Sequence, residues 1–269
     1  MTRLGCWIST HPKQWLSATG SVPMVNDTLP VACEQPFEFS AVNEVNIMDK
    51  KAIEKEVRRL QSEIWSQRDV RYHLGVPGIP TLFDPRNVAD HCGLYYDVRE
   101  RLDTDYAGGG EAAGIWQRDR STILVSRRFS YETQRFTAGH EIGHFILHPQ
   151  VGDRTLHRER ALGGSRSYRS PIEQEADYFS ACLLMPRKAV INQFDARYAC
   201  KHPLVLTETV AYHLKVDAGL LFSQPRGSLL FTEAVARAEH FDGRRFESMA
   251  RHFGVSASAM AIGWKSWDL

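Results

Sequence analysis

Residues 135–148 read RFTAGHEIGHFILH, and the centre of this stretch, His140 to His144, has the pattern HExxH. On an α-helix, residues four apart lie on the same face, one turn above the other. His140 and His144 can therefore both direct a ring nitrogen at one metal ion, at roughly 2.0–2.1 Å. Glu141 lies a third of a turn away, near the place of a metal-bound water. The pattern predicts a helix that carries a zinc site for peptide hydrolysis.

The neighbouring sequence supports a helix over residues 131–148. Ser130 is a suitable N-cap, and the segment contains neither proline nor a pair of glycines. Upstream, residues 122–126 read TILVS and predict a strand, which we expect to form one wall of a substrate cleft. The alternative is a solvated helix with two surface histidines, because five-residue motifs recur by chance.

A second segment, residues 170–186, reads SPIEQEADYFSACLLMP and predicts a helix between two prolines. A catalytic zinc site keeps one position for water, so the chain needs one further ligand. We expect Glu173 to be that ligand, with Glu175 as the main competitor. Glu173 can instead complete a capping box with Ser170. Asp177 lies on the same helix face as Glu173 and can bond to the far ring nitrogen of a zinc histidine, whereas Glu175 points roughly to the opposite side.

A zinc peptidase also needs a hydrogen-bond donor for the oxyanion of the reaction. The candidates are His148, His157 and Tyr178, and the sequence does not choose among them. His148 can instead serve the last carbonyls of its own helix. The metzincin spacing requires a histidine where Gln150 stands, which excludes that subclass.

These two blocks carry a resemblance to a known family. Residues 135–148 resemble the RFTxAHExGHxxLH signature of the ImmA/IrrE metallopeptidases, and Glu173–Pro186 resembles the ExEAxxFAxxLLMP block of the same family. Weaker likeness extends to residues 84–94 and 249–260. The departures are Gly139 and Ser180, at positions where the family usually has alanine. Gly139 costs roughly 1 kcal/mol of helix stability relative to alanine.

The resemblance implies a Zn²⁺ site built from two histidines, one glutamate and a water. It also implies a protein substrate, a helix-turn-helix repressor whose cleavage relieves transcriptional repression, as in mobile-element transfer or the stress response. The alternative function is a transcription regulator or toxin–antitoxin component that acts by binding DNA or a partner. An intact Glu141 favours the enzyme, because a protein that only binds has no need of a general base.

The composition bears on the possible partners and the cellular compartment of the protein. The chain has 269 residues and a formal net charge of +1, which argues neither for nor against nucleic acid. Its five cysteines form no CxxC pair, so a reducing, cytoplasmic setting is the simplest. No apolar stretch approaches the roughly 18–20 residues that span a bilayer, and we expect no membrane partner.

The chain is predicted to have three parts. Residues 1–47 mix Gly, Ser, Thr and Pro without periodicity and predict a flexible N-terminal extension. Residues 48–190 are expected to form the metallopeptidase domain, which starts with a helix over 48–68. We expect an α+β fold in which a small twisted sheet, with strands near 94–98, 113–116 and 122–126, packs against the metal-bearing helices.

Residues 191–269 are predicted to be mostly helical. Residues 246–260 resemble a helix-turn-helix, with Gly254 in the turn and Ser256 capping the next helix. That second helix is poor in Arg and Lys, so DNA is possible but not favoured as a partner. The Arg-rich segment 150–170 predicts either a solvated loop or a clamp on an acidic substrate or DNA.

Overall fold

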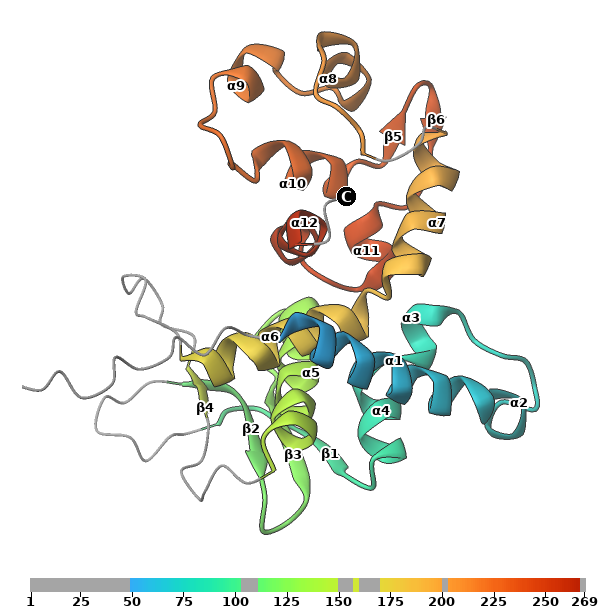
Figure 1. The fold of residues 1–269 in the computed structure, drawn as a ribbon, viewed down its shortest axis with the longest axis vertical. Coiled ribbons are helices and arrows are strands. Elements are labelled where there is room, and N and C mark those ends of the chain that lie inside the picture. The colour runs from blue at the N-terminus through green and yellow to red at the C-terminus, as the bar shows by residue number, and fades with distance from the viewer. Residues whose placement is uncertain (1–48, 103–110, 150–156, 160–169, 200–202, 267–269) are drawn as a thin grey trace, which may run out of the picture. The chain divides into compact units, whose positions relative to one another are not determined.

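The computed structural model describes residues 49–102, 111–149, 157–159, 170–199 and 203–266 (Figure 1). These residues belong to one compact unit that begins at Val45. The predicted N-terminal extension and most of the Arg-rich segment lie outside the described residues, so the interpretations given for them stay predictions. None of the helices described here has the length and apolar character needed to cross a lipid bilayer.

The described elements begin with four helices and three strands, and after the next helix and one short strand they are mostly helical. In chain order they are α1 (Lys50–Ser66), α2 (Arg68–Arg71), α3 (Ile79–Leu82), α4 (Pro85–His91), β1 (Tyr95–Arg99), β2 (Ala112–Gln117), β3 (Thr122–Ser126), α5 (Tyr131–Leu147), β4 (His157–Glu159), α6 (Pro171–Leu184), α7 (Arg187–Tyr198), α8 (Glu208–Leu214), α9 (Ala218–Phe222), α10 (Leu230–Arg237), β5 (His240–Phe241), β6 (Arg244–Arg245), α11 (Met249–Phe253) and α12 (Ala257–Ser266). The fold is therefore α+β, with a small sheet followed by a helical C-terminal region, as the sequence predicts.

The main sheet has the strand order β1-β3-β2-β4. Strand β1 runs parallel to β3, whereas β2 is antiparallel to both β3 and β4. The predicted strand over 122–126 is confirmed, and its role as one wall of a substrate cleft stays a prediction. Both edges of β3 are hydrogen-bonded to neighbouring strands, so it has no free edge for a peptide. The edge strands of this sheet are β1 and β4.

Helices α5 and α6 form the centre of the fold and pack closely against each other (Figure 1). Ser130 caps α5 by accepting from the amide of Thr133, and α5 also packs against β2 and β3. A Cβ placed on Gly143 would lie 3.2 Å from both Ala176 Cα and Phe179 Cβ of α6. The glycine of the HExxH segment therefore allows the close approach of the two helices that carry the predicted site.

Helix α1 covers α6 with the apolar face that the sequence predicts. Its four core residues, Ile53, Val57, Leu60 and Ile64, are all buried. Between them, Gln61 Nε2 donates to the carbonyl of Cys182 at 3.2 Å and so anchors α1 to α6. The predicted helix over 48–68 is confirmed with slightly tighter bounds.

Among the described residues of the C-terminal region, the helix pairs α8–α9 and α11–α12 are joined by similar turns. Lys215 and Gly254 occupy the left-handed region in the two turns, with φ of 55° and 60°. After the first turn, the amide of Val216 donates to Ala211 at 3.1 Å, and Val255 donates to Ala250 at 3.0 Å after the second. The predicted turn at Gly254 is found, whereas the sequence analysis did not identify the α8–α9 pair.

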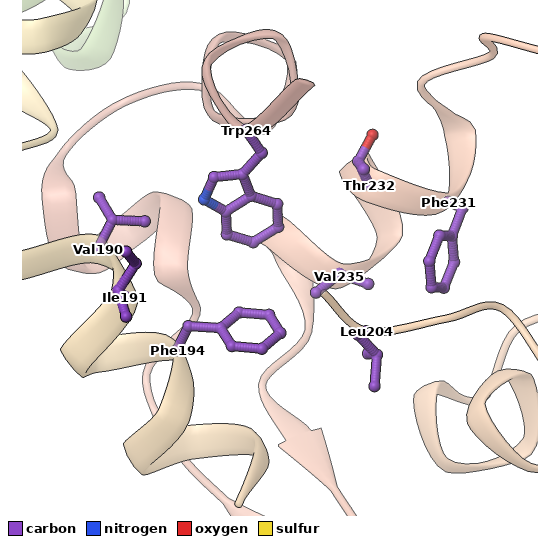
Figure 2. Close-up of a pocket in the computed structure, with 8 residues that line it drawn as sticks. All are labelled: Val190, Ile191, Phe194, Leu204, Phe231, Thr232, Val235 and Trp264. Carbon is purple, nitrogen blue, oxygen red and sulfur yellow. The ribbon is translucent and has the colours of Figure 1, made fainter. Parts of the chain in front are cut away.

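A small apolar cavity lies between α7, α10 and α12 (Figure 2). The rings of Phe194 and Trp264 border it and meet edge to face, with their centroids 5.8 Å apart. The cavity volume is about 30 Å³, far below the ~150 Å³ of an engineered cavity that holds benzene. We interpret it as a packing gap and not as a ligand site.

The two departures from the family pattern meet in the α5–α6 interface. A Cβ on Gly139 would lie 2.6 Å from Ser180 Oγ, and this hydroxyl donates to the carbonyl of Phe136 at 2.7 Å. Gly139→Ala should therefore destabilise the protein by about 1–2 kcal/mol through overpacking, despite the better helix propensity of alanine. In a Ser180→Ala background the same change should be neutral or stabilising by up to about 1 kcal/mol.

The test is the free energy of unfolding in denaturant for both single variants and the double variant, all measured without metal. The expected result is a coupling energy of about 1 kcal/mol or more, as residues in contact give. Simple additivity of the two substitutions would show that the close approach of Gly139 and Ser180 has no energetic consequence.

Candidate metal centre

Three side chains from two helices bring nitrogen and oxygen donors together. His140 Nε2 and His144 Nε2, one turn apart on α5, are 3.0 Å from each other. Glu173, in the first turn of α6, places one carboxylate oxygen 3.2 Å from His140 Nε2 and the other 3.2 Å from His144 Nε2. Among the described residues, this is the group of His, Cys, Asp or Glu that could hold a metal ion.

The donor spacing fits a small divalent cation. A tetrahedral ion bound at roughly 2.0–2.1 Å requires its donor atoms to be roughly 3.3 Å apart, close to the 3.0–3.2 Å separations found. Two imidazoles and one carboxylate are a ligand set that suits zinc. The residues present therefore fit a metal with three protein ligands.

Asp177 lies behind the first histidine, as predicted from its spacing. Its Oδ1 is 2.9 Å from His140 Nδ1, the ring nitrogen that faces away from the donor cluster. A proton on Nδ1 bonds to the carboxylate and leaves the Nε2 lone pair for a metal. The contact thus favours the metal-binding tautomer of His140.

The second histidine has a different arrangement behind it. His144 Nδ1 lies 3.2 Å from His148 Nδ1, and His148 Nε2 lies 2.8 Å from Glu175 Oε2. Glu175 therefore faces the C-terminal end of α5 and not the donor cluster, whereas the sequence analysis expected it to point to the side of α6 opposite Glu173. The sequence analysis did not anticipate this contact, although His148 stands four residues after His144 and hence on the same face.

The electrostatics of the cluster favour an ionised Glu173. Burial alone would raise the pKa of its carboxyl, but hydrogen bonds from His140 and His144 and their charges hold that pKa well below its usual range. Burial also lowers the pKa of His144. An ionised carboxylate is the form of Glu173 that can bind a metal ion. The amide of Glu173 donates to Ser170 Oγ at 3.4 Å, so Ser170 caps α6 while the Glu173 carboxylate faces the histidines.

Glu141 is completely buried next to the histidines. A Cβ placed on Gly114 of β2 would lie 3.6 Å from Glu141 Cγ, which locates this side chain between α5 and the sheet. An ionisable group in such a position is typical of a functional site.

The three candidate oxyanion donors differ in their surroundings. The Tyr178 hydroxyl donates to Glu54 Oε1 at 2.7 Å, and both ring nitrogens of His148 are engaged by His144 and Glu175. The Tyr178 hydroxyl and the His148 ring nitrogens already have hydrogen-bond partners in the protein. We therefore do not propose Tyr178 or His148 as an oxyanion donor. His157 lies on β4, and its side chain is outside the described residues.

Arg135 of the RFT segment has a structural position that the sequence analysis missed. Its side chain is buried, forms an ion pair with Asp84 at 3.3 Å and donates to the carbonyl of Pro80 at 3.0 Å. Arg135 therefore ties the beginning of α5 to the α3–α4 segment. The resemblance of residues 84–94 to the family was the available signal for this contact.

Comparison with known proteins gives one family match. The family model of the IrrE N-terminal-like domain, Peptidase_M78, matches residues 96–219. No curated protein matches the chain. The matched segment runs from β1 into α9 and contains both helices of the donor cluster. The match over this segment supports the resemblance of the chain to the ImmA/IrrE family of peptidases.

Proposed function

We propose that this protein is a zinc-dependent endopeptidase that cleaves a helix-turn-helix DNA-binding repressor and thereby relieves transcriptional repression. The observation that carries the proposal is the triangle of donors from His140, His144 and Glu173, with the buried Glu141 carboxylate beside it. The match to the Peptidase_M78 family model supports the peptidase activity. The repressor as substrate rests on the resemblance to the family.

In the proposed mechanism, the metal ion and the side chains of the protein have different roles. When bound, zinc lowers the pKa of a water molecule toward ~7 and polarises the scissile carbonyl. Glu141 accepts the proton of the attacking water and then donates it to the leaving amine. His140, His144 and Glu173 hold the ion, and Asp177 keeps His140 in the tautomer that can bind it.

DNA binding by the C-terminal helices receives less support. In the second helix of the predicted helix-turn-helix, α12, Lys265 in the last turn is the basic residue. Recognition helices usually carry several Arg, Lys, Asn or Gln side chains toward the bases. A regulator that acts only through DNA is therefore the weaker alternative.

The test is cleavage of a candidate repressor in vitro. The purified protein, loaded with zinc, is incubated with a small helix-turn-helix protein encoded next to it, and the products are analysed by mass spectrometry. We expect two fragments, no cleavage in the presence of a zinc chelator, and recovery on adding zinc. A repressor that stays intact with fully loaded protein would contradict the substrate, and cleavage that is insensitive to the chelator would contradict the metal.

A further inference from the structure

A relay of side chains connects α6 with the second histidine of the donor cluster. Glu175 Oε2 is 2.8 Å from His148 Nε2, and His148 Nδ1 is 3.2 Å from His144 Nδ1. His144 is completely buried and His148 is 8% exposed, so water competes little for the contact between the two rings. His140, in contrast, has a carboxylate directly on its Nδ1.

We infer that His148 and Glu175 are positioning residues that orient His144 for zinc and fix its tautomer. The inference rests on the proposed zinc site. It gives Glu175, the competitor of Glu173 for the ligand role, a function of its own in that site. It also gives His148 a role other than capping α5 or donating to an oxyanion.

The hydrogen positions in this relay are linked. His144 can bind a metal through Nε2 only if Nδ1 carries its proton, and this proton must then be accepted by the lone pair of His148 Nδ1. His148 Nε2 consequently carries the other proton and donates it to Glu175. The carboxylate thus selects, through His148, the tautomer in which His144 presents a lone pair to the donor cluster.

The backbone of His148 is held independently of this relay. His148 follows the last residue of α5, and its amide donates to the carbonyl of His144 at 3.0 Å. Arg118, which follows β2, donates to the carbonyls of His148 at 3.1 Å and Pro149 at 3.2 Å. The Arg118 guanidinium lies over the Trp116 ring, 4.3 Å from its centroid. The His148 ring is therefore presented from a fixed point, as an orienting side chain requires.

The test is zinc affinity, measured by competition with a chromophoric chelator. The variants are His148→Ala, Glu175→Ala, the double variant and Glu175→Gln, with Gln174→Ala as control because this neighbouring side chain is exposed on the same helix. Each single alanine variant should weaken zinc binding by roughly 10- to 100-fold, as the loss of an orienting partner does. The double variant should be little weaker than His148→Ala, because both changes break one relay.

The conservative variant Glu175→Gln distinguishes a role in orienting His144 from a general role in the stability of the fold. Glu175→Gln retains an oxygen that accepts from His148 Nε2 and should keep an affinity within a few-fold of wild type, as should Gln174→Ala. With Co²⁺ in place of zinc, His148→Ala and Glu175→Ala should change the visible absorption spectrum, and Glu175→Gln should preserve it. Circular dichroism of the metal-free variants checks that each is folded. If His148→Ala fails to fold, the contrast between Glu175→Ala and Glu175→Gln decides.

The outcomes distinguish the inference from the proposed function. Wild-type protein that binds no zinc would overturn both. Wild-type protein that binds zinc, with Glu175→Ala and His148→Ala at the same affinity, would overturn the inference alone. Additive losses in the double variant would also overturn it, because independent effects exclude a shared relay.

Discussion

Replacement of Glu141 by glutamine is expected to abolish peptide cleavage while the protein keeps its zinc. Glutamine has the same shape but no basic oxygen for the proton of the attacking water. Loss of a positioned general base typically costs about 10²–10⁴ in rate. Because the proposed ligands are His140, His144 and Glu173, metal content should stay at the wild-type level. Single-turnover cleavage of the repressor and metal analysis of the same preparation measure both quantities.

Glu132→Gln is the matched control for this experiment. It removes a carboxylate from the first turn of the same helix, about two turns before His140, and should leave cleavage unchanged. Full activity of Glu141→Gln would assign the general base to another residue. Loss of zinc from Glu141→Gln would show instead that Glu141 supports the metal site itself.

The sequence correctly predicted the helices, strands and turns that are marked by a few neighbouring residues, such as a cap or a turn glycine. Helix α5 starts after Ser130, and the Ser130 hydroxyl accepts a hydrogen bond at the helix N-terminus as expected of a cap. Strand β3 has the predicted bounds because its residues form a short apolar run that is buried in the sheet. The turn at Gly254 was visible because glycine commonly occupies the left-handed position after a helix.

Other elements depend on contacts that a single sequence does not display. Strand β4 has three residues and is defined by its pairing with β2. The turn between α8 and α9 has Lys215 in the left-handed position, so the glycine that marks the second turn is missing from the first. The pairing of Gly139 with Ser180 was likewise hidden, although both positions stood out as departures from the family pattern.

The sequence predicted which residues form the candidate site, but it did not predict the contact between Glu175 and His148 behind it. Helical spacing placed His140 and His144 on one face, and it placed Asp177 near them. Spacing could not show that the carboxylate of Glu175 reaches His148, because this distance depends on how α6 crosses α5. The close approach at Gly143 sets that crossing, and it follows from packing between distant segments.

Glu173→Ala is expected to have the largest effect on zinc binding of any substitution in α6. The change removes one of the three proposed protein donors, and the remaining two imidazoles, whose Nε2 atoms are 3.0 Å apart, should provide a much weaker site. Its loss of affinity should therefore exceed the roughly 10- to 100-fold expected when only an orienting partner such as Glu175 is lost. Chelator competition on Glu173→Ala and Glu175→Ala, purified in parallel, measures the order.

The opposite order would move the third ligand to Glu175 and would require α6 to turn, since Glu175 now faces His148. Glu173→Gln refines the test, because an amide oxygen is a neutral and weaker donor to a divalent cation than a carboxylate. We expect its affinity to lie between those of wild type and Glu173→Ala. An affinity equal to wild type would mean that the Glu173 carboxylate does not bind the metal, and its hydrogen bonds to His140 and His144 would then be its whole role.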